Sequence, residues 1–292
     1  RGRAEHPATA GTRRAGLTGR TDGVAGGGAL QAGIFRRYPG DPLGKAAPMS
    51  LVPNDALIVA HGSPADPGPQ EAALMALAVR VALWLPGWRV RGATLAAPGA
   101  LERALRGLDR PLVYPFFMAE GWFTRTTLPG RLEAAGAGDL VRLAAFGTDP
   151  RLPALMARQA LDAARAAGMD PGRSTLLVAA HGSQVSRASS TITEAVAATL
   201  RRTTPFARVA TGYVEEPPFL HEAASAPGPA LCLPFFALRA GHVAGDVPEA
   251  LARAGFAGPL LPAVGEAPEV ARMVAATLAA ARAAPAPRAP VA

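Results

Sequence analysis

The sequence predicts an α/β protein made of two similar halves, each a doubly wound parallel sheet. The first observation behind this prediction is an internal repeat. An apolar run ending in His-Gly-Ser at 56–63 recurs at 176–183, and a run ending in Pro-Phe-Phe at 112–117 recurs at 231–236. The second observation is that short apolar runs alternate with longer amphipathic stretches in both copies. Such alternation is typical of parallel strands joined by right-handed helical crossovers.

The spacing of the repeat indicates that a whole domain was duplicated. His61 precedes Pro115 by 54 residues, and His181 precedes Pro234 by 53 residues. Three matched blocks in the same order at nearly equal spacing are not expected by chance. The third pair of blocks is 130–136 and 249–255.

The individual elements follow from the pattern along each copy. Short apolar runs bounded by Gly or Pro predict strands that are buried on both faces. These strands are expected near 56–60, 89–95, 111–117 and 140–145, and again near 174–180, 207–214, 229–236 and 258–262. Amphipathic stretches predict helices at 69–84, 151–167, 191–202 and 266–282. Thr191 and Glu194 have the spacing of a capping box, which predicts the start of the third of these helices.

The repeat and the local composition divide the chain into four segments. The first half spans 49–170 with a degenerate site, and the second half spans 171–282 with the active site. Residues 1–48 are expected to be a disordered extension, with Met49 as the expected native start. Residues 283–292 alternate Ala with Pro and form a tail that is poorly suited to a core.

Composition excludes several classes of protein. Apolar residues make up 49% and charged residues 18% of the chain, which excludes an intrinsically disordered protein. The net charge is +8, but residues 1–48 carry five of these charges, so no nucleic-acid partner is expected. Cys232 is the single cysteine, which excludes an internal disulfide framework and a zinc site of several thiolates. No apolar run is long enough to span a membrane, and we expect a cytoplasmic protein.

The candidate site lies where the strands end. Ligands of open parallel sheets bind beyond the carboxyl ends of the strands, and both His-Gly-Ser triplets are expected there. Aligning the halves places His181, Glu215 and His242 at the ends of three successive strands of the second half. The corresponding residues of the first half are His61, Ala96 and Phe123. The second half therefore carries a polar site, and the first half carries its degenerate counterpart.

Two imidazoles and a carboxylate are suited to two kinds of chemistry. They bind divalent first-row metal ions, and they accept protons near neutral pH. The competing interpretation of a histidine in an apolar fold is a hydrogen-bonded structural residue, and we favour it for His61 and His221. Glu216 follows Glu215 directly, and the repeat alignment selects Glu215. Trp122 is a packing residue or a stacking surface for a planar ligand, and packing is favoured.

Over roughly residues 54–282 the chain resembles the sirohydrochlorin chelatases, which insert cobalt or iron into a tetrapyrrole in cobalamin and sirohaem biosynthesis. The resemblance rests on the blocks 176–183, 212–215 and 233–243, and the two-half arrangement is similar to the duplicated members of that family. It implies a lyase-class metal chelatase with a chelatase-like fold and no organic cofactor. The implied substrates are a small-molecule tetrapyrrole and Co²⁺ or Fe²⁺.

The resemblance also implies roles for individual residues. His181 and His242 would present the metal ion, and Glu215 with one histidine would accept the pyrrole protons. The substrate carries many carboxylates, for which Arg187, Arg239 and Arg125 are candidate partners or else ordinary solvated side chains. The sequence does not fix the metal or the oligomeric state.

Other functions are weighed against the same residues. A histidine phosphatase needs Arg before the strand-end histidine, where Ala60 and Ala180 stand, and no Gly-x-Ser-x-Gly nucleophile motif occurs. The alternative that stays open is a non-catalytic carrier of metal or tetrapyrrole with the same fold, because fold alone does not separate the two.

Overall fold

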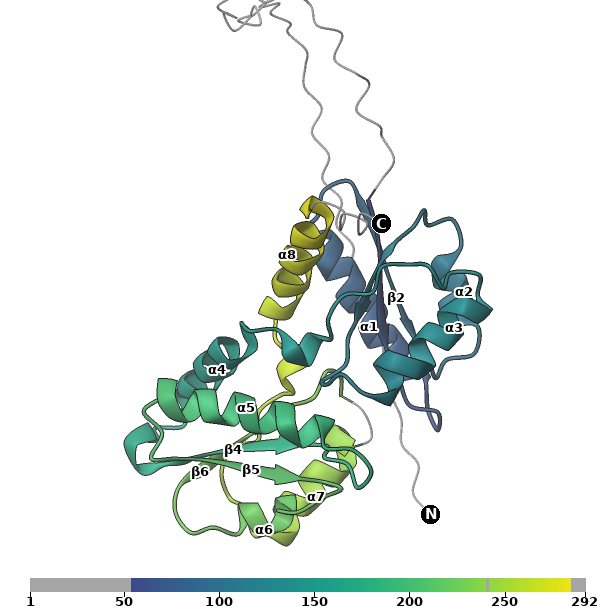
Figure 1. Ribbon diagram of the computed structural model, residues 1–292. Coiled ribbons are helices and arrows are strands. Elements are labelled where there is room, and N and C mark those ends of the chain that lie inside the picture. Colours follow the sequence, from purple (N-terminus) through teal and green to yellow (C-terminus); the bar gives the residue numbers. More distant parts are fainter. Residues whose placement is uncertain (1–53, 240–241, 285–292) are drawn as a thin grey trace, which may run out of the picture. The chain divides into compact units, whose positions relative to one another are not determined.

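A computed structural model describes residues 54–239 and 242–284, without the side chains of His242 and Val243. The first half contains a three-stranded parallel sheet in the order β2-β1-β3 (Figure 1). Its helices follow the strands in alternation. The elements of this half are β1 (Asn54–Ala60), α1 (Gly68–Ala82), β2 (Trp88–Thr94), α2 (Ala100–Leu105), β3 (Leu112–Pro115), a π-helical turn η1 (Phe123–Thr127), α3 (Leu128–Ala134), a 3-10 turn η2 (Phe146–Thr148) and α4 (Leu152–Ala166).

The second half repeats this arrangement with its strands in the order β5-β4-β6, again all parallel. Its elements are a 3-10 turn η3 (Pro171–Arg173), β4 (Thr175–Ala180), α5 (Ala188–Thr203), β5 (Arg208–Tyr213), α6 (Leu220–Ala224), β6 (Ala230–Pro234), a π-helical turn η4 (His242–Asp246), α7 (Val247–Arg253), a 3-10 turn η5 (Val264–Glu266) and α8 (Glu269–Ala283). The predicted fold of two similar parallel-sheet halves is confirmed.

Alternation along the central strands assigns side chains to two cores. Leu57 and Val59 of β1 face a core that belongs to the first half alone, and Leu177 of β4 faces the matching core of the second half. Ile58 and Val178 face the opposite way, into one large core that contains residues of both halves. Because successive side chains of a strand point to opposite faces, each sheet is covered on both sides.

The helices that cover the shared core are exchanged between the halves. α8, the last helix of the second half, packs against α1, and α4 packs against α5. Figure 1 shows α4 and α5 side by side over the second sheet, with α8 beside α1. Each sheet is thus partly covered by a helix that follows the other sheet in the sequence. This exchange joins the two halves through apolar side chains.

The fourth predicted strand of each half is wrong. Near 140–145 and 258–262 the chain forms only one isolated parallel bridge in each half, Val113 with Arg142 and Cys232 with Leu260. In the second half, Pro259 and Pro262 flank the bridge and have no N–H to extend a ladder. Within the described residues, each sheet has three strands.

The start of α5 differs from the predicted start. α5 begins at Ala188, so the Thr191 N–H already bonds the Arg187 carbonyl, and the predicted capping box is wrong. The predicted extension at 1–48 lies outside the described residues, as do the last eight residues of the predicted tail. No described helix is long and apolar enough to cross a bilayer.

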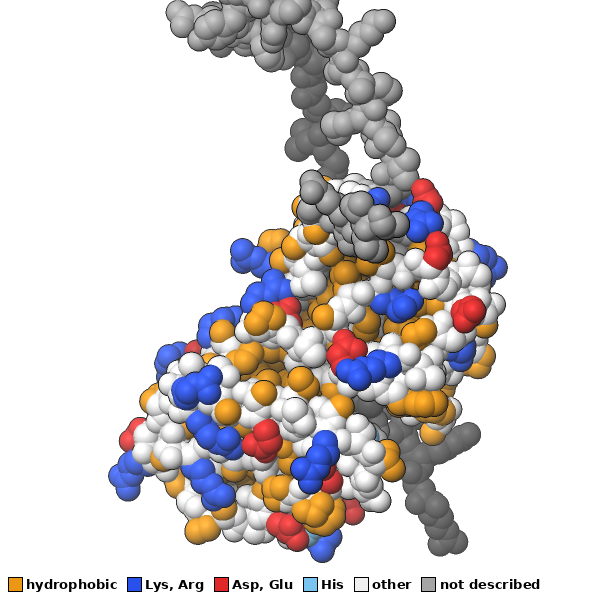
Figure 2. Space-filling model, in the orientation of Figure 1, with side chains coloured by type: hydrophobic (Ala, Val, Ile, Leu, Met, Phe, Trp, Pro, Cys, Tyr) orange, Lys and Arg blue, Asp and Glu red, His pale blue; other side chains and the backbone are white. Residues whose placement is uncertain are grey.

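The charged side chains of the described surface are mixed in sign. On the face drawn in Figure 2, basic side chains are interspersed with acidic ones and with apolar patches. All the basic ones are arginines, because Lys45 is the last lysine in the chain. The face drawn therefore offers no continuous basic surface.

Candidate functional site

The two halves have the same backbone geometry at their strand ends. The Ala96 N–H donates to the His61 carbonyl at 2.9 Å, and the Glu215 N–H donates to the His181 carbonyl at 2.9 Å. The two π-helical turns also correspond, because η1 begins at Phe123 and η4 begins at His242. The residues that the repeat alignment pairs therefore occupy equivalent backbone positions in the two halves.

The glycine after each histidine is required by the turn. Gly62 and Gly182 have φ of +79° and +75°, a region that residues with a Cβ rarely adopt. A Cβ on Gly182 would lie 2.9 Å from the Cβ of Tyr213 and 2.9 Å from the Cγ of Glu216. The chain consequently turns sharply at the strand end and leaves the preceding histidine at the edge of the sheet.

His181 and Glu215 face each other at this edge. Nδ1 of His181 is 3.6 Å from Oε2 of Glu215, and both side chains are about two-fifths exposed, at 39% and 42%. The same Nδ1 lies 3.0 Å from the Gly182 carbonyl, which only accepts hydrogen bonds. Nδ1 therefore carries the proton of the neutral ring, and the lone pair is on Nε2, the arrangement found in metal-binding histidines.

Glu216 contacts the turn after His181, whereas Glu215 contacts the His181 ring. Its Oε1 accepts a hydrogen bond of 3.0 Å from the Ser183 N–H. The side chain thus lies across the His-Gly-Ser turn and holds it, whereas Glu215 points toward the imidazole. The geometry agrees with the repeat alignment, which selects Glu215 rather than Glu216 as the residue beside the histidine.

A cavity of about 610 Å³ brings the two halves of the candidate site together. It is lined by His61 and His181 from the two strand ends and by Asp246 from η4. Its remaining walls are mainly apolar, and they include Phe116, Phe117, Met118, Phe123, Phe236, Ala237 and Leu238. A smaller cavity of about 500 Å³ is lined by Arg187, Glu215 and Glu216 with the turn that follows His181.

His61 lines the larger of these two cavities, and it lacks the hydrogen bond expected of a structural histidine. Its Nδ1 is buried and has no hydrogen-bond partner among the described residues. Its ring lies against Phe123, with the ring centroids 4.1 Å apart. Burial lowers the pKa of His61 below its usual value, and nearby His181 lowers it further. The ring is therefore neutral near pH 7.

Comparisons with known proteins agree with these features. A sequence profile of the CbiX family matches residues 175–281. Among solved structures, the chain matches CbiX, the terminal enzyme for biosynthesis of siroheme in denitrifying bacteria, with 50% sequence identity and a TM-score of 0.72. The match covers 78% of this chain and 99% of that one. The chain belongs to the CbiX family.

Two further solved structures share the fold of this CbiX family member. SirB from Bacillus subtilis with Fe³⁺ is 16% identical, with a TM-score of 0.62, over 79% of this chain and 94% of that one. The sirohydrochlorin chelatase SirB from Bacillus subtilis subspecies spizizenii in complex with cobalt is 15% identical, with a TM-score of 0.56, over 75% and 91%. A comparison with curated proteins gave no match.

The structure brings together some of the predicted site residues of this CbiX family member. His181 and Glu215 are adjacent, whereas the side chain of His242 lies outside the described part of the chain. Among the described side chains, no three His, Cys, Asp or Glu residues are grouped to hold a metal ion. A third metal ligand at His242 remains a prediction.

The predicted substrate arginines are only partly brought to the site. Arg187 lines the smaller cavity. Arg125 and Arg239 are exposed and are not among the residues that line these two cavities, and their role as substrate partners stays a prediction. The packing interpretation of Trp122 is wrong, because this residue is 70% exposed. His221 belongs to a separate pocket of about 230 Å³ and stacks on Phe219.

Two polar residues of the cavity were missed by the sequence prediction. Asp246 ends η4, and Gln70 lies in the first turns of α1 with only 5% of its surface exposed. Both lie several residues beyond a strand end, where the strand-end rule gives no signal. Another cavity, of about 820 Å³, lies elsewhere, around the start of β6, and none of the side chains that line it is ionisable.

Proposed function

We propose that this chain is a lyase-class chelatase that inserts a divalent metal ion, Co²⁺ or Fe²⁺, into sirohydrochlorin. The observation that carries the proposal is the 50% identity to CbiX across 99% of that protein. The cobalt complex of the SirB chelatase, which has the same fold, supports a metal ion as one substrate. The tetrapyrrole is the other, and the protein requires no organic cofactor.

The second half supplies the polar groups for this reaction. Insertion removes two pyrrole protons while the ion exchanges water for ring nitrogens. His181 presents its Nε2 lone pair to the ion, because Nδ1 is engaged with the Gly182 carbonyl. Glu215, which faces the same imidazole, accepts one of the two protons, and one of the site histidines accepts the other. We assign His242 as the second imidazole ligand on the strength of its position at the start of η4.

The apolar walls of the cavity serve the other substrate. A tetrapyrrole has a broad planar face, which aromatic and aliphatic side chains contact favourably. Arg187 beside Glu215 and Glu216 is positioned to pair with a peripheral carboxylate of the macrocycle. A carrier of metal alone would not need an apolar cavity of this kind. A tetrapyrrole carrier would need one, so the insertion assay is required to separate that alternative from the chelatase.

The decisive experiment is an anaerobic insertion assay. The purified full chain is mixed with sirohydrochlorin and Co²⁺ or Fe²⁺, and the absorption spectrum of the macrocycle is followed against a protein-free reaction. We expect acceleration by the wild type and by Arg165→Ala, a surface control, and loss of acceleration in His181→Ala. If the wild type binds metal and macrocycle but does not accelerate insertion, the protein is the non-catalytic carrier instead.

A further inference from the structure

The outer face of α1 carries large apolar side chains that are exposed. We call these residues the α1 ridge: Met75, Val79, Leu83 and Trp84, which are 53%, 64%, 77% and 56% exposed. The first three recur at every fourth residue, so they form one row along the helix. A surface helix normally carries polar side chains on this face, and an exposed apolar patch usually marks an interaction site.

The corresponding helix of the second half shows that the fold does not require an apolar ridge here. The two helices align by four buried residues with the same spacing, Leu74, Leu77, Ala78 and Val81 in α1 and Thr193, Val196, Ala197 and Leu200 in α5. In this alignment, α5 has Glu194, Ala198, Arg202 and Thr203 where α1 has the ridge. The outer face of α5 is therefore largely polar, and the apolar ridge is a property of the first half.

We propose that the α1 ridge docks against the same ridge of a second copy of this chain. An antiparallel pair of α1 helices with a twofold axis at Val79 places Met75 of each copy against Leu83 of the other. Rows of every fourth residue interdigitate in the commonest class of helix packing, and a twofold interface requires such a self-complementary surface. Between residues 72 and 84, Arg80 is the only exposed residue that is charged. Its long stem allows the guanidinium to stay in water beside the ridge.

The exposed area of the ridge matches the apolar part of a stable dimer interface. At roughly 200 Å² for a large side chain, the exposed fractions of the four residues amount to roughly 500 Å² per copy and about 1,000 Å² for the pair. A homodimer interface of standard size buries about 1,600 Å² in total, of which about 65% is apolar. The neighbouring helix α8 supplies part of the rim, because the Arg272 guanidinium lies over the Trp84 ring, 5.5 Å from its centre.

The inference does not depend on the proposed chelatase function. The four ridge residues are not among those that line the cavity with His61 and His181. The oligomeric state of the protein therefore tests the ridge, and the insertion assay tests the site.

Sedimentation velocity of the purified full chain, from about 1 to about 100 µM, measures the association. We expect a dimer in the wild type. Met75→Glu and Leu83→Arg each introduce two charges into the apolar interface, one from each copy, and each should raise the dissociation constant about 100-fold. The double variant should recover part of the affinity, because the antiparallel arrangement pairs each new carboxylate with a guanidinium of the other copy. Both positions are more than half exposed, and circular dichroism verifies that the variants fold.

Ala195→Glu is the matched control, because it places the same charge on an exposed position of α5, and it should leave the dimer unchanged. A wild type that is monomeric at about 100 µM overturns the inference. If that monomer sediments with phosphatidylglycerol vesicles, the ridge binds a membrane surface instead. A dimer that Met75→Glu and Leu83→Arg leave intact, or a double variant that is no tighter than the single ones, also overturns the inference.

Discussion

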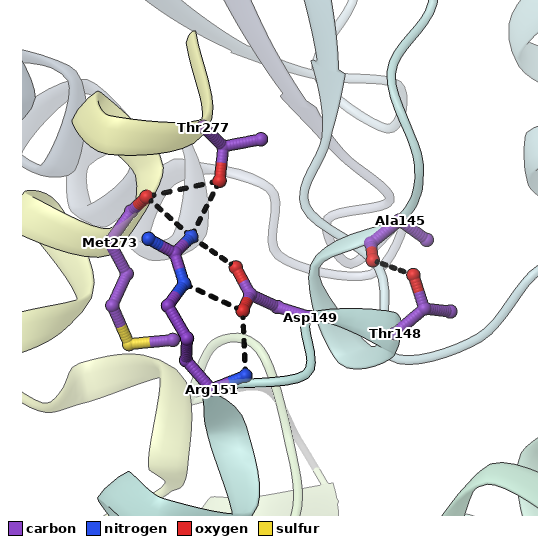
Figure 3. A network of polar contacts seen from close by, with 6 residues as sticks. All are labelled: Ala145, Thr148, Asp149, Arg151, Met273 and Thr277. Atoms are coloured by element: carbon purple, nitrogen blue, oxygen red, sulfur yellow. Dashed lines mark hydrogen bonds and ion pairs between the residues drawn. The ribbon is translucent and has the colours of Figure 1, made fainter. Parts of the chain in front are cut away.

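Replacing Arg151 by methionine tests how the two halves are held together. Arg151 precedes α4 and is bound to Asp149 through its backbone N–H and its guanidinium. The same guanidinium reaches α8, where it donates to the Met273 carbonyl at 2.9 Å and to the Thr277 hydroxyl at 2.6 Å (Figure 3). One side chain thus connects the end of the first half with the last helix of the second.

The expected loss follows from the burial of the partner. The Asp149 side chain is 7% exposed and that of Arg151 is 44% exposed. Removing one member of a fully buried pair costs about 3–5 kcal/mol, because the other charge is left without its partner. Solvent at the guanidinium screens part of this interaction, and the backbone N–H still bonds Asp149. We therefore expect a loss of about 2 kcal/mol in the free energy of unfolding, or about 4–8 °C in Tm.

Urea denaturation and thermal unfolding followed by circular dichroism measure this loss. Arg165→Met is the matched control, because its pair with Asp162 has both side chains exposed, at 78% and 69%, and should contribute less than about 0.5 kcal/mol. Adding Asp149→Asn to Arg151→Met should recover part of the stability, since it removes the unpaired charge. The reasoning is refuted if Arg151→Met is no more destabilising than Arg165→Met.

Two further predictions concern the carboxylates. Glu215→Gln should slow cobalt insertion about 100-fold, because the amide cannot accept a pyrrole proton. Its Tm should stay within about 1 °C of the wild type, because the side chain is part-exposed. An insertion rate within about threefold of the wild type would contradict the proton-acceptor role. Asp149→Asn tests the pH dependence of stability. Burial opposes ionisation of Asp149, but hydrogen bonds from Arg151 outweigh it and lower the pKa of this carboxyl below its usual 3.8. The wild type should therefore exceed the variant in stability at pH 7 and lose that advantage as the pH falls below about 4 through the folded-state pKa. Urea titrations at pH 7, 4 and 3 check this, and a constant difference would show that Asp149 is not the titrating group.

The central strands and the positions of the histidines could be predicted because they depend on local pattern and on the repeat. A continuous apolar run such as 176–180 has few alternatives to a buried strand, and Gly182 marks the turn after it. The edges of the sheets could not be predicted in this way. The runs near 140–145 and 258–262 are apolar enough for strands, but each forms one isolated bridge. In the second run, Pro259 and Pro262 lack the backbone donors that a longer ladder needs.

The hydrogen-bond partners of individual side chains also could not be predicted from the sequence pattern. Glu194 has capping-box spacing, yet its carboxylate accepts hydrogen bonds from the Thr211 and Tyr213 hydroxyls on β5. The choice depends on which strand lies beside the helix, which is a tertiary property. The exchange of α4 and α8 between the halves is also a tertiary property. Both helices carry an apolar face, and the sequence pattern does not say which of the two sheets that face covers.

Duplication within one chain gives this cavity an asymmetry that two identical halves could not have. Identical halves would place a carboxylate and the same imidazoles on both sides of a planar ligand, and the two carboxylates would repel each other. Here Ala96 and Phe123 stand where the second half has Glu215 and His242, and the one acidic side chain that lines the cavity, Asp246, comes from the second half. Under the proposed function, a macrocycle between these walls would have one face toward His181 and the other toward the rings of the first half. The divergence of the first half is therefore better explained as specialisation for the substrate face than as loss of function.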